Sequence, residues 1–339
     1  MLRPVHNPPN PWATTHVEWL GDPPTQAPRV FEEEARSLLT ENDSPDIPFR
    51  FGANPYRGCQ HACAYCYARP THQYLDFGAG SDFELKLVVK VNAPELLERA
   101  FRRPSWRGEF VMFSGVTDCY QPLEASYQLT RRCLEVCLRC RNPVAVITKG
   151  TLVRRDAELL AQLARVAAAR VYVSIPFSDE GHSRALEPGA PLPSQRFATL
   201  RALSEAGVPT GVAVAPILPG LSDRQIPEIL ARARDAGATR AFPTLLRLPA
   251  EVRPVFEERL QAALPEHAAR VLAALEAMRE GRRNDNRFGA RFCGSGPRWQ
   301  AVADLFRVQC RRLGLHTGAE AALRETFRRP HGQGELFSD

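Results

Sequence analysis

Three cysteines lie close together in the stretch CQHACAYCYARP, which spans residues 59–70. Cys59, Cys63 and Cys66 are separated by three and two residues, and Gly58 directly before them allows the backbone to bend. Thiolates this close in sequence can converge on one metal centre. A [4Fe–4S] cluster held by three thiolates leaves its fourth iron open to another ligand. The spacing therefore predicts an iron–sulfur cluster with one iron available for chemistry.

Two other interpretations of this motif stay open. Zinc is also bound by cysteine, but structural zinc sites take four ligands, usually in paired Cys and His spacings. His61 lies between the cysteines and reaches a fourth ligand position only with strained local geometry. The three thiols can also be unligated groups of a reactive loop. The cluster explains the number and the spacing of the cysteines more directly than either alternative.

A second triplet, Cys133, Cys137 and Cys140, repeats the same gaps in CLEVCLRC. No Gly or Pro interrupts residues 129–141, so this stretch is expected to be helical with its cysteines on one face. On a straight helix the outer two cysteines lie ~10 Å apart at 1.5 Å per residue, which suits a single compact cluster poorly. Buried free cysteine behaves as a small hydrophobe. This triplet is therefore predicted to pack, not to bind a metal.

The composition is that of a soluble globular protein. Of the 339 residues, 44% are hydrophobic and 24% are charged. No run approaches the ~18 apolar residues of a membrane span. The N-terminal stretch MLRPVHNPPNPWATTHVEWL lacks the apolar core of a signal peptide, which predicts a cytoplasmic protein. In a reducing compartment the nine cysteines are not expected to form structural disulfides.

The chain carries a mild basic excess, with a formal net charge of +6. Arginine supplies nearly all of the positive charge, because Lys86, Lys90 and Lys149 are the only lysines. The excess is compatible with an anionic partner such as nucleic acid. A genomic bias towards arginine explains it equally well, so nucleic-acid binding is only weakly supported.

Alternating β-rich and helical segments predict an α/β core. The six predicted strands start roughly 30 residues apart after the first, the length of a βαβ unit with a parallel sheet. They are residues 51–56, 109–115, 143–150, 170–177, 209–217 and 239–248. Helices are expected between them at 127–140, 157–169, 193–207 and 224–237, and beyond them at 256–264, 267–281 and 297–314.

The remaining segments complete the predicted organisation. Residues 31–39 are expected to form a short acidic helix, and residues 84–92 an additional strand outside the series. We predict an N-terminal arm at 1–45, a core at 46–285, and a C-terminal helical extension and tail at 286–339. The last eight residues are expected to be frayed.

Four motifs together resemble the radical S-adenosylmethionine (radical SAM) superfamily, in the branch related to spore photoproduct lyase. These motifs are NPYRGCQHACAYCYAR, SGVTDCYQPLE, ITKG and APILPGLSD. The resemblance implies a (β/α)6 partial barrel. It also implies that SAM binds the open iron of a [4Fe–4S] cluster and is cleaved to methionine and a 5′-deoxyadenosyl radical, which abstracts hydrogen from a substrate.

The resemblance also implies roles for particular side chains. Cys59, Cys63 and Cys66 correspond to the cluster ligands, and the aromatic residue before the last of them is Tyr65. The loop 114–118 corresponds to the segment that binds the SAM amino group. The implied SAM-binding side chains are Tyr65, Ser114, Thr117, Asp118, Lys149, Ser174 and Arg196. For Lys149, Ser174 and Arg196, solvated or packing roles stay open.

The likeness to the lyase weakens at its hydrogen-donating cysteine. That position is Gly115 here, and the nearest thiol, Cys119, is our candidate catalytic residue, with a packed thiol as the alternative. Glu187 with Arg184 is interpreted as a surface ion pair, with a substrate clamp as the alternative. The glycine-rich stretch around Cys293 is interpreted as a turn that lets the chain reverse, with anion binding at the N-terminus of the following helix as the alternative.

Three functions follow from these observations. The first is a radical SAM enzyme that acts on an unidentified substrate. The second is a DNA-lesion repair lyase of the spore photoproduct type, and the third is a non-catalytic iron–sulfur electron carrier. The enzymatic functions require a low-potential electron donor of the flavodoxin or ferredoxin type. No membrane partner is expected.

Overall fold

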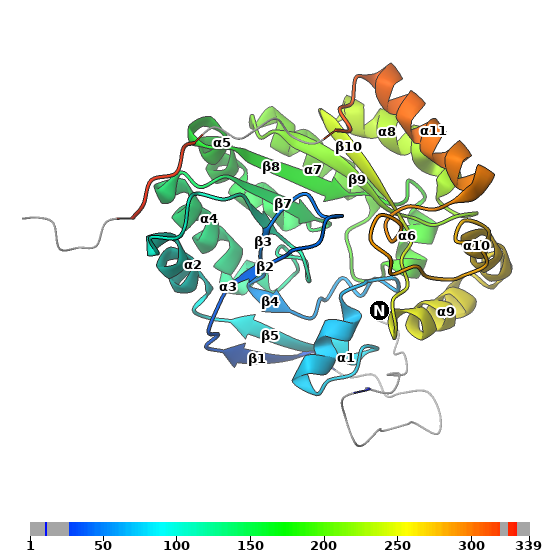
Figure 1. Cartoon of the computed structure of the whole chain (residues 1–339), viewed down its shortest axis with the longest axis horizontal. Helices are drawn as coiled ribbons and strands as arrows, with labels where there is room; N and C mark the ends of the chain where they lie inside the picture. The colour runs from blue at the N-terminus through cyan, green and yellow to red at the C-terminus, as the bar shows by residue number, and fades with distance from the viewer. Residues whose placement is uncertain (1–10, 12–26, 319–324, 331–339) are drawn as a thin grey trace, which may run out of the picture.

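The computed structural model describes residue 11, residues 27–318 and residues 325–330. Its main sheet has seven strands in the order β10-β9-β8-β7-β6-β3-β2, and only β2 runs antiparallel to its neighbour (Figure 1). The strands are β2 (Leu39–Glu41), β3 (Phe51–Ala53), β6 (Val111–Phe113), β7 (Val144–Thr148), β8 (Ala169–Ser174), β9 (Thr210–Ile217) and β10 (Arg240–Leu245). The six parallel strands are those predicted, and they confirm the α/β fold of a partial barrel.

Continuous apolar runs explain why these segments are strands. Strands buried on both faces, as in a parallel sheet covered by helices, lack the alternation of a half-exposed strand. In β7, VAVIT, four of five side chains are buried, and β9 begins with five consecutive buried residues. These runs could therefore be recognised as central strands from the sequence.

The predicted crossover helices lie between the strands. They are α4 (Leu129–Cys140), α5 (Ala157–Val166), α7 (Pro193–Glu205) and α8 (Ile226–Asp235), with α2 (Ala93–Arg102) before β6 and the short α3 (Glu124–Tyr127) and α6 (Glu180–Leu186). Both α7 and α8 carry a proline in the first turn. Gly207 and Gly237 follow them with positive φ, the usual arrangement at a helix C-terminus.

A second, three-stranded sheet lies beside the barrel, in the order β1-β5-β4. It contains β1 (Arg29–Glu33), β4 (Tyr56–Arg57) and β5 (Lys86–Lys90), with the short α1 (Asp82–Leu85) before β5. The extra strand predicted at 84–92 is confirmed as β5. The acidic helix predicted at 31–39 is wrong, because this segment contributes to β1 and β2. Pairing of β1 along all five residues of β5 outweighs the helix propensity of its glutamates.

The C-terminal part of the chain forms α9 (Val252–Ala263), α10 (Pro265–Ala277) and α11 (Gly296–Leu313), close to the predicted helices. Figure 1 shows α11 beside α8, beyond β10. Residues 325–330 then reach α4, where the Arg328 amide donates to the Cys140 carbonyl at 2.7 Å. The tail predicted to be frayed lies outside the described residues.

The cysteines outside the first triplet behave largely as predicted. Cys133, Cys137 and Cys140 are buried on α4 among core side chains, which confirms their packing role. Cys293 is exposed, and the neighbouring Gly294 lies so close to Trp299 that a Cβ would approach its ring carbon at 2.8 Å. The glycine-rich stretch therefore serves the turn. Among the described residues, no helix is long and apolar enough to cross a membrane.

Candidate active site

The loop that carries the cysteine triplet directly follows β4 and lies at the centre of the molecule (Figure 1, light blue). Cys59 and Cys63 are buried, and Cys66 is partly exposed. The loop needs Gly58, because its φ of +75° is left-handed and a Cβ there would approach the Phe83 carbonyl oxygen at 2.8 Å. The Cys59 amide donates to that same carbonyl at 2.9 Å. The backbone therefore bends where the sequence predicts.

The three thiols suit a cluster better than a single ion. Cys59, Cys63 and Cys66 lie in one bent loop, and after burial the charges of Cys63 and Cys66 are among the causes that raise the pKa of the Cys59 thiol. Among the described residues, however, no three Cys, His, Asp or Glu side chains are arranged to hold one metal ion. Thiolates of a [4Fe–4S] cluster bind different irons and need not meet at a point. Three cysteines are also one ligand fewer than a structural zinc site takes, whereas they fit a cluster with one open iron.

The surroundings of the triplet can compensate the negative charge that ligation places on the sulfurs. Burial raises the pKa of the Cys63 thiol to about 12, and the positive charge of Lys149 opposes this shift. The positive charge of Arg196 also lowers the pKa of Cys63. Thiolates are the ligating form, so cations beside the loop fit a bound cluster.

A buried network of charged residues holds the loop from behind. The Arg69 guanidinium donates to the Cys63 carbonyl at 2.8 Å through Nη2 and at 3.2 Å through Nε, and it is ion-paired with Glu84. Arg259, from α9, is ion-paired with the same glutamate at 2.6 Å and donates to the Ala62 carbonyl at 2.5 Å. The geometry of the cysteine loop therefore depends on α1 and α9 as well as on its own sequence.

Glu187 is the centre of a second buried network. Its carboxylate accepts hydrogen bonds from Tyr65 and Arg196, and the Lys149 ammonium lies 3.7 Å away. Burial opposes ionisation of Glu187, but Arg196 and Lys149 outweigh it and hold its pKa below the ordinary value. The predicted surface ion pair with Arg184 is wrong, because Glu187 is 1% exposed.

This network brings together three residues predicted to bind SAM. Lys149 follows the end of β7, Arg196 lies in the first turn of α7, and Tyr65 precedes the last cysteine of the triplet. Burial opposes the charge of Lys149, yet Cys63 and Glu187 together hold its pKa above the ordinary value. The network therefore carries two cations and one carboxylate beside the thiols.

Ser174 lies at the end of the neighbouring strand β8. Its hydroxyl donates to the Ala215 carbonyl at 3.1 Å, and its own carbonyl accepts from Arg196 at 3.1 Å. Lys149 and Ser174 thus lie at the C-terminal ends of the consecutive strands β7 and β8, and Arg196 reaches the same rim of the barrel from the start of α7. This rim is where parallel barrels place their ligands.

The loop after β6 is fixed by the side chains predicted to bind the SAM amino group. Asp118 accepts from the Thr148 hydroxyl at 2.6 Å and from the Lys149 amide at 2.7 Å, and lies 3.2 Å from His61 Nδ1. Burial opposes its ionisation, but His61 and these hydrogen bonds lower its pKa to about 2. Asp118 is therefore a carboxylate that joins the cysteine loop to β7.

The two hydroxyls of this loop also have internal partners. Thr117 donates to the Gly58 carbonyl at 2.6 Å, and Ser114 accepts from the Cys119 amide at 2.9 Å. Thr117 also accepts from Gln121 Nε2 at 3.3 Å, and each of the two hydroxyl oxygens has one further lone pair. These contacts position the loop and leave acceptor capacity for an ammonium group.

Cys119 differs from the residues of this rim because apolar side chains surround it. Its side chain is fully buried in the hydrophobic core, and its carbonyl accepts from the Thr130 hydroxyl at 2.7 Å. Burial raises the pKa of its thiol well above the ordinary value. The catalytic role of Cys119 stays a prediction, and its enclosure by core side chains favours the packed alternative.

Sequence analysis missed the buried residues that position the cysteine loop and the cations of the rim. Arg69, Glu84 and Arg259 are far apart in sequence, and nothing in their spacing indicates that they meet. Glu187 lies nine residues before Arg196, but the pair forms only because the loop after α6 folds back against the start of α7. Tertiary proximity of this kind has no local sequence signal.

Comparison with known families decides which group of proteins this chain belongs to. The sequence profile of the Radical SAM superfamily matches residues 53–233, which include the cysteine loop and the strands up to β9. The chain belongs to the radical SAM superfamily. Members of this superfamily are generally enzymes that use a [4Fe–4S] cluster and SAM. The thiols and charged side chains at this rim are consistent with that.

Among its relatives is an uncharacterized protein of Mycobacterium tuberculosis, 41% identical over 226 residues. The aligned region covers 66% of each chain, just under two thirds of that relative. An uncharacterized protein of Methanocaldococcus jannaschii is 31% identical over 174 residues, which cover 51% of this chain and 62% of the relative.

Solved structures of spore photoproduct lyase share the fold. One is 16% identical with a TM-score of 0.63, over 85% of this chain and 81% of the other, and is complexed with a dinucleoside spore photoproduct. A variant of that enzyme, with a TM-score of 0.62 and 16% identity over the same shares of the two chains, has AdoMet bound as well. At this identity the likeness concerns the fold alone.

Proposed function

We propose that this protein is a radical SAM enzyme in which Cys59, Cys63 and Cys66 hold a [4Fe–4S] cluster. The observation that carries the proposal is the position of the three thiols in one bent loop whose Tyr65 contacts the network of Lys149, Glu187 and Arg196. With SAM at its open iron, such a cluster supplies the electron that cleaves SAM to methionine and a 5′-deoxyadenosyl radical, which abstracts hydrogen from the substrate. A flavodoxin or ferredoxin type of protein in the cytoplasm is the proposed source of that electron.

The charges of the rim suit the carboxylate of SAM. Lys149 and Arg196 carry two positive charges and Glu187 one negative charge, so one positive charge remains. This excess matches one carboxylate in a buried site, where an unmatched charge is costly. Glu187 also fixes the direction of both cations, which limits the reorganisation needed on binding.

The opposite charge of SAM, its ammonium group, suits the loop after β6. Ser114, Thr117 and Asp118 supply oxygen acceptors there, and Asp118 is ionised at neutral pH because its pKa is low. Contacts between this loop and the cysteine loop, through Thr117 and His61, would hold the two halves of the site in register. Ser174 and Tyr65 line the same rim as positioning residues.

Two alternatives receive less support. An electron carrier with all irons bound by protein needs a fourth ligand, and His61, the histidine within the cysteine loop, has its Nδ1 3.2 Å from the Asp118 carboxylate. Repair of a DNA lesion by the lyase mechanism lacks the hydrogen-donating cysteine at Gly115. Salt-sensitive binding of damaged DNA would be the minimum requirement for that alternative.

The test is formation of 5′-deoxyadenosine by the anaerobically reconstituted and reduced protein. We expect wild type to form it from SAM and Cys63→Ala to form none, because the variant loses a cluster ligand. Cys293→Ala is the matched control, since it removes an exposed thiol far in sequence from the triplet, and it should retain activity. Activity in Cys63→Ala equal to that of the control would refute the proposal.

A further inference from the structure

Two arginines beyond the end of β10 have no acidic partner. Arg247 follows β10 by two residues and forms no hydrogen bond or ion pair within the described part of the chain, and its Nε is buried. Arg279, only 3% exposed, donates from Nη2 to the carbonyls of Leu246 and Arg291 at 2.9 Å and 3.1 Å. Its Nε and Nη1 are buried without a hydrogen-bond partner.

The carboxylates that act on these arginines are already paired with others. Asp46 is ion-paired with Arg291 at 2.7 Å, and Asp285 with Arg287 at 2.6 Å. Burial lowers the pKa of Arg247, and the positive charge of Arg291 lowers it further. Arg247 in turn acts on Arg279 in the same direction. Arg247 and Arg279 therefore place two positive charges close together at a site with little access to water. This arrangement lowers stability unless an anion binds there.

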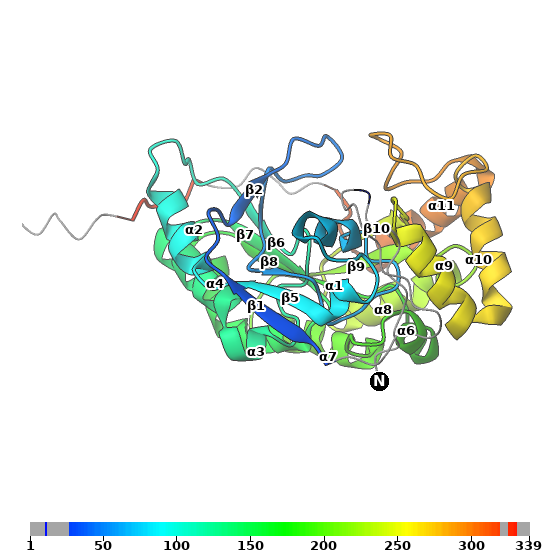
Figure 2. The same ribbon diagram turned by 90° about the horizontal axis from the view of Figure 1, so that it is seen from below.

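Arg247 and Arg279 lie at the mouth of the barrel. Residues 42–50 and the segment before α11 project from the same side of the molecule in Figure 2, and the Gly289 amide donates to Asp46 at 2.7 Å. Tyr67, next to the last cysteine of the triplet, lies within electrostatic range of Arg247. Its hydroxyl donates to the Gly115 carbonyl in the loop proposed to bind SAM. Arg247 therefore borders the proposed reaction site.

Two aromatic side chains lie beside Arg247 and its neighbour Arg291. Phe288 is 63% exposed and lies under the Arg291 guanidinium at 4.9 Å, while Phe292 packs against both Arg247 and Arg291. An apolar border lowers the local dielectric and strengthens attraction for an anion. A guanidinium with several free N–H groups binds oxyanions through paired hydrogen bonds.

We propose that Arg247 and Arg279 form an oxyanion-binding site that holds a phosphate or carboxylate group of the substrate at the barrel mouth. The inference that this anion belongs to a substrate rests on the proposed radical SAM function, whereas the binding of an oxyanion does not depend on it. The site lies on the β10 side, whereas the charges suited to SAM lie at the ends of β7 and β8, so the two anionic groups would bind separately.

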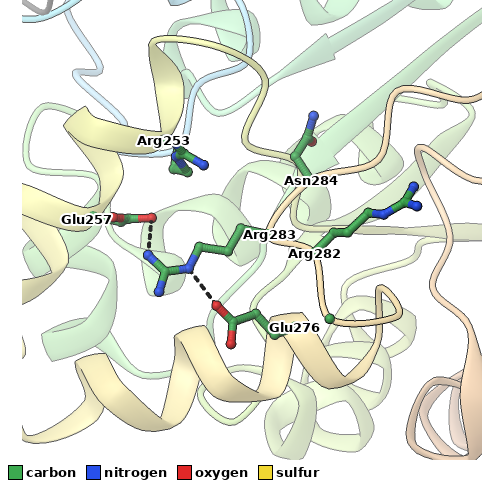
Figure 3. A pocket seen from close by; sticks show the side chains of 7 residues that line it. Arg253, Glu257, Glu276, Arg282, Arg283 and Asn284 are labelled. Carbon is green, nitrogen blue, oxygen red and sulfur yellow. Dashed lines mark hydrogen bonds and ion pairs between the residues drawn. The ribbon is translucent and has the colours of Figure 1, made fainter.

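A depression near this site has largely matched charges, and one of its arginines provides the control variant. It lies between α9, α10 and the following loop, and Figure 3 shows Arg283 between Glu257 and Glu276, with ion pairs of 2.8 Å and 2.7 Å. Its charges are therefore largely matched. Arg282 is exposed there and points away from these ion pairs (Figure 3). Arg282→Gln removes the same charge as Arg247→Gln at a site that we do not assign to an oxyanion.

The test is calorimetric titration of the reconstituted full chain with inorganic phosphate and, separately, with succinate at matched ionic strength. We expect saturable binding of at least one of them. Arg247→Gln should weaken it about tenfold or more, because charge-assisted hydrogen bonds are lost, and Arg247→Lys should weaken it less. Arg282→Gln should bind within about twofold of wild type, because Arg282 is exposed and solvent screens its charge.

The melting temperature of the anion-free protein guards against misfolding. Arg247 has no hydrogen-bond or ion-pair partner among the described residues, and glutamine can keep part of its packing on Phe292, so Arg247→Gln should melt at or above the temperature of wild type. Preference for phosphate would indicate a phosphorylated substrate, and preference for succinate a carboxylic acid. No saturable binding by wild type, or equal losses in Arg247→Gln and Arg282→Gln, would overturn the site. Wild-type 5′-deoxyadenosine formation, measured on the same preparation, tests the proposed function independently.

Discussion

At the scale of single residues, the site depends on buried charges that compensate one another. Glu187 contacts Tyr65, Lys149 and Arg196, and none of these partners is close to it in sequence. Removing one member of a buried network leaves the others without compensation, which costs more than the net contribution of the pair. Glu187 is therefore expected to matter for stability as well as for SAM binding.

Glu187→Gln should lower the free energy of unfolding by on the order of 3 kcal/mol, because it leaves Lys149 and Arg196 buried without their carboxylate. Anaerobic urea denaturation measures this change. Glu180→Gln is the control, since it breaks the exposed pair of Glu180 with Arg184 and should cost at most about 0.5 kcal/mol. Equal effects of the two substitutions would contradict the role of Glu187.

At the scale of elements, the cysteine loop is supported by helices that belong to other parts of the chain. Arg259 reaches it from α9, and Glu84 joins Arg259 to Arg69. The C-terminal helices are thereby connected to the proposed cluster. A change in α9 should consequently alter how firmly the loop holds its metal.

Arg259→Met should speed loss of the cluster to a chelator several-fold, because the Ala62 carbonyl loses its donor and the loop gains freedom. The decay of visible absorbance after anaerobic addition of the chelator measures this rate. Arg253→Met, an exposed position on the same helix, should decay at the wild-type rate. If Arg259→Met also matched wild type, α9 would have no part in positioning the loop.

Prediction from sequence succeeded for elements whose signals are local. The six parallel strands have apolar runs and regular spacing, so their order along the barrel could be anticipated. Residues 31–39 were mispredicted because pairing with β5 decides their conformation, and β5 lies some fifty residues later. The cysteine loop was recognisable from its spacing, whereas Glu187 and Arg247 acquire their surroundings only through the folded chain.

At the scale of the whole molecule, segments far apart in the sequence meet at two places. Segment 42–50 meets the segment before α11 through the Asp46–Arg291 ion pair. Residues 325–330 cross to α4 and α2, where Phe327 packs on Phe101 at 5.9 Å between ring centroids. The first of these contacts covers part of the mouth of the barrel, which would limit access of water to a reactive intermediate.

The account as a whole depends on an iron that the protein leaves open. The most direct test is the EPR spectrum of the reduced, reconstituted protein, recorded with and without SAM. We predict a [4Fe–4S] signal that changes when SAM is added, because SAM becomes a ligand of the fourth iron. A cluster with full iron content whose spectrum is the same with and without SAM would contradict the account.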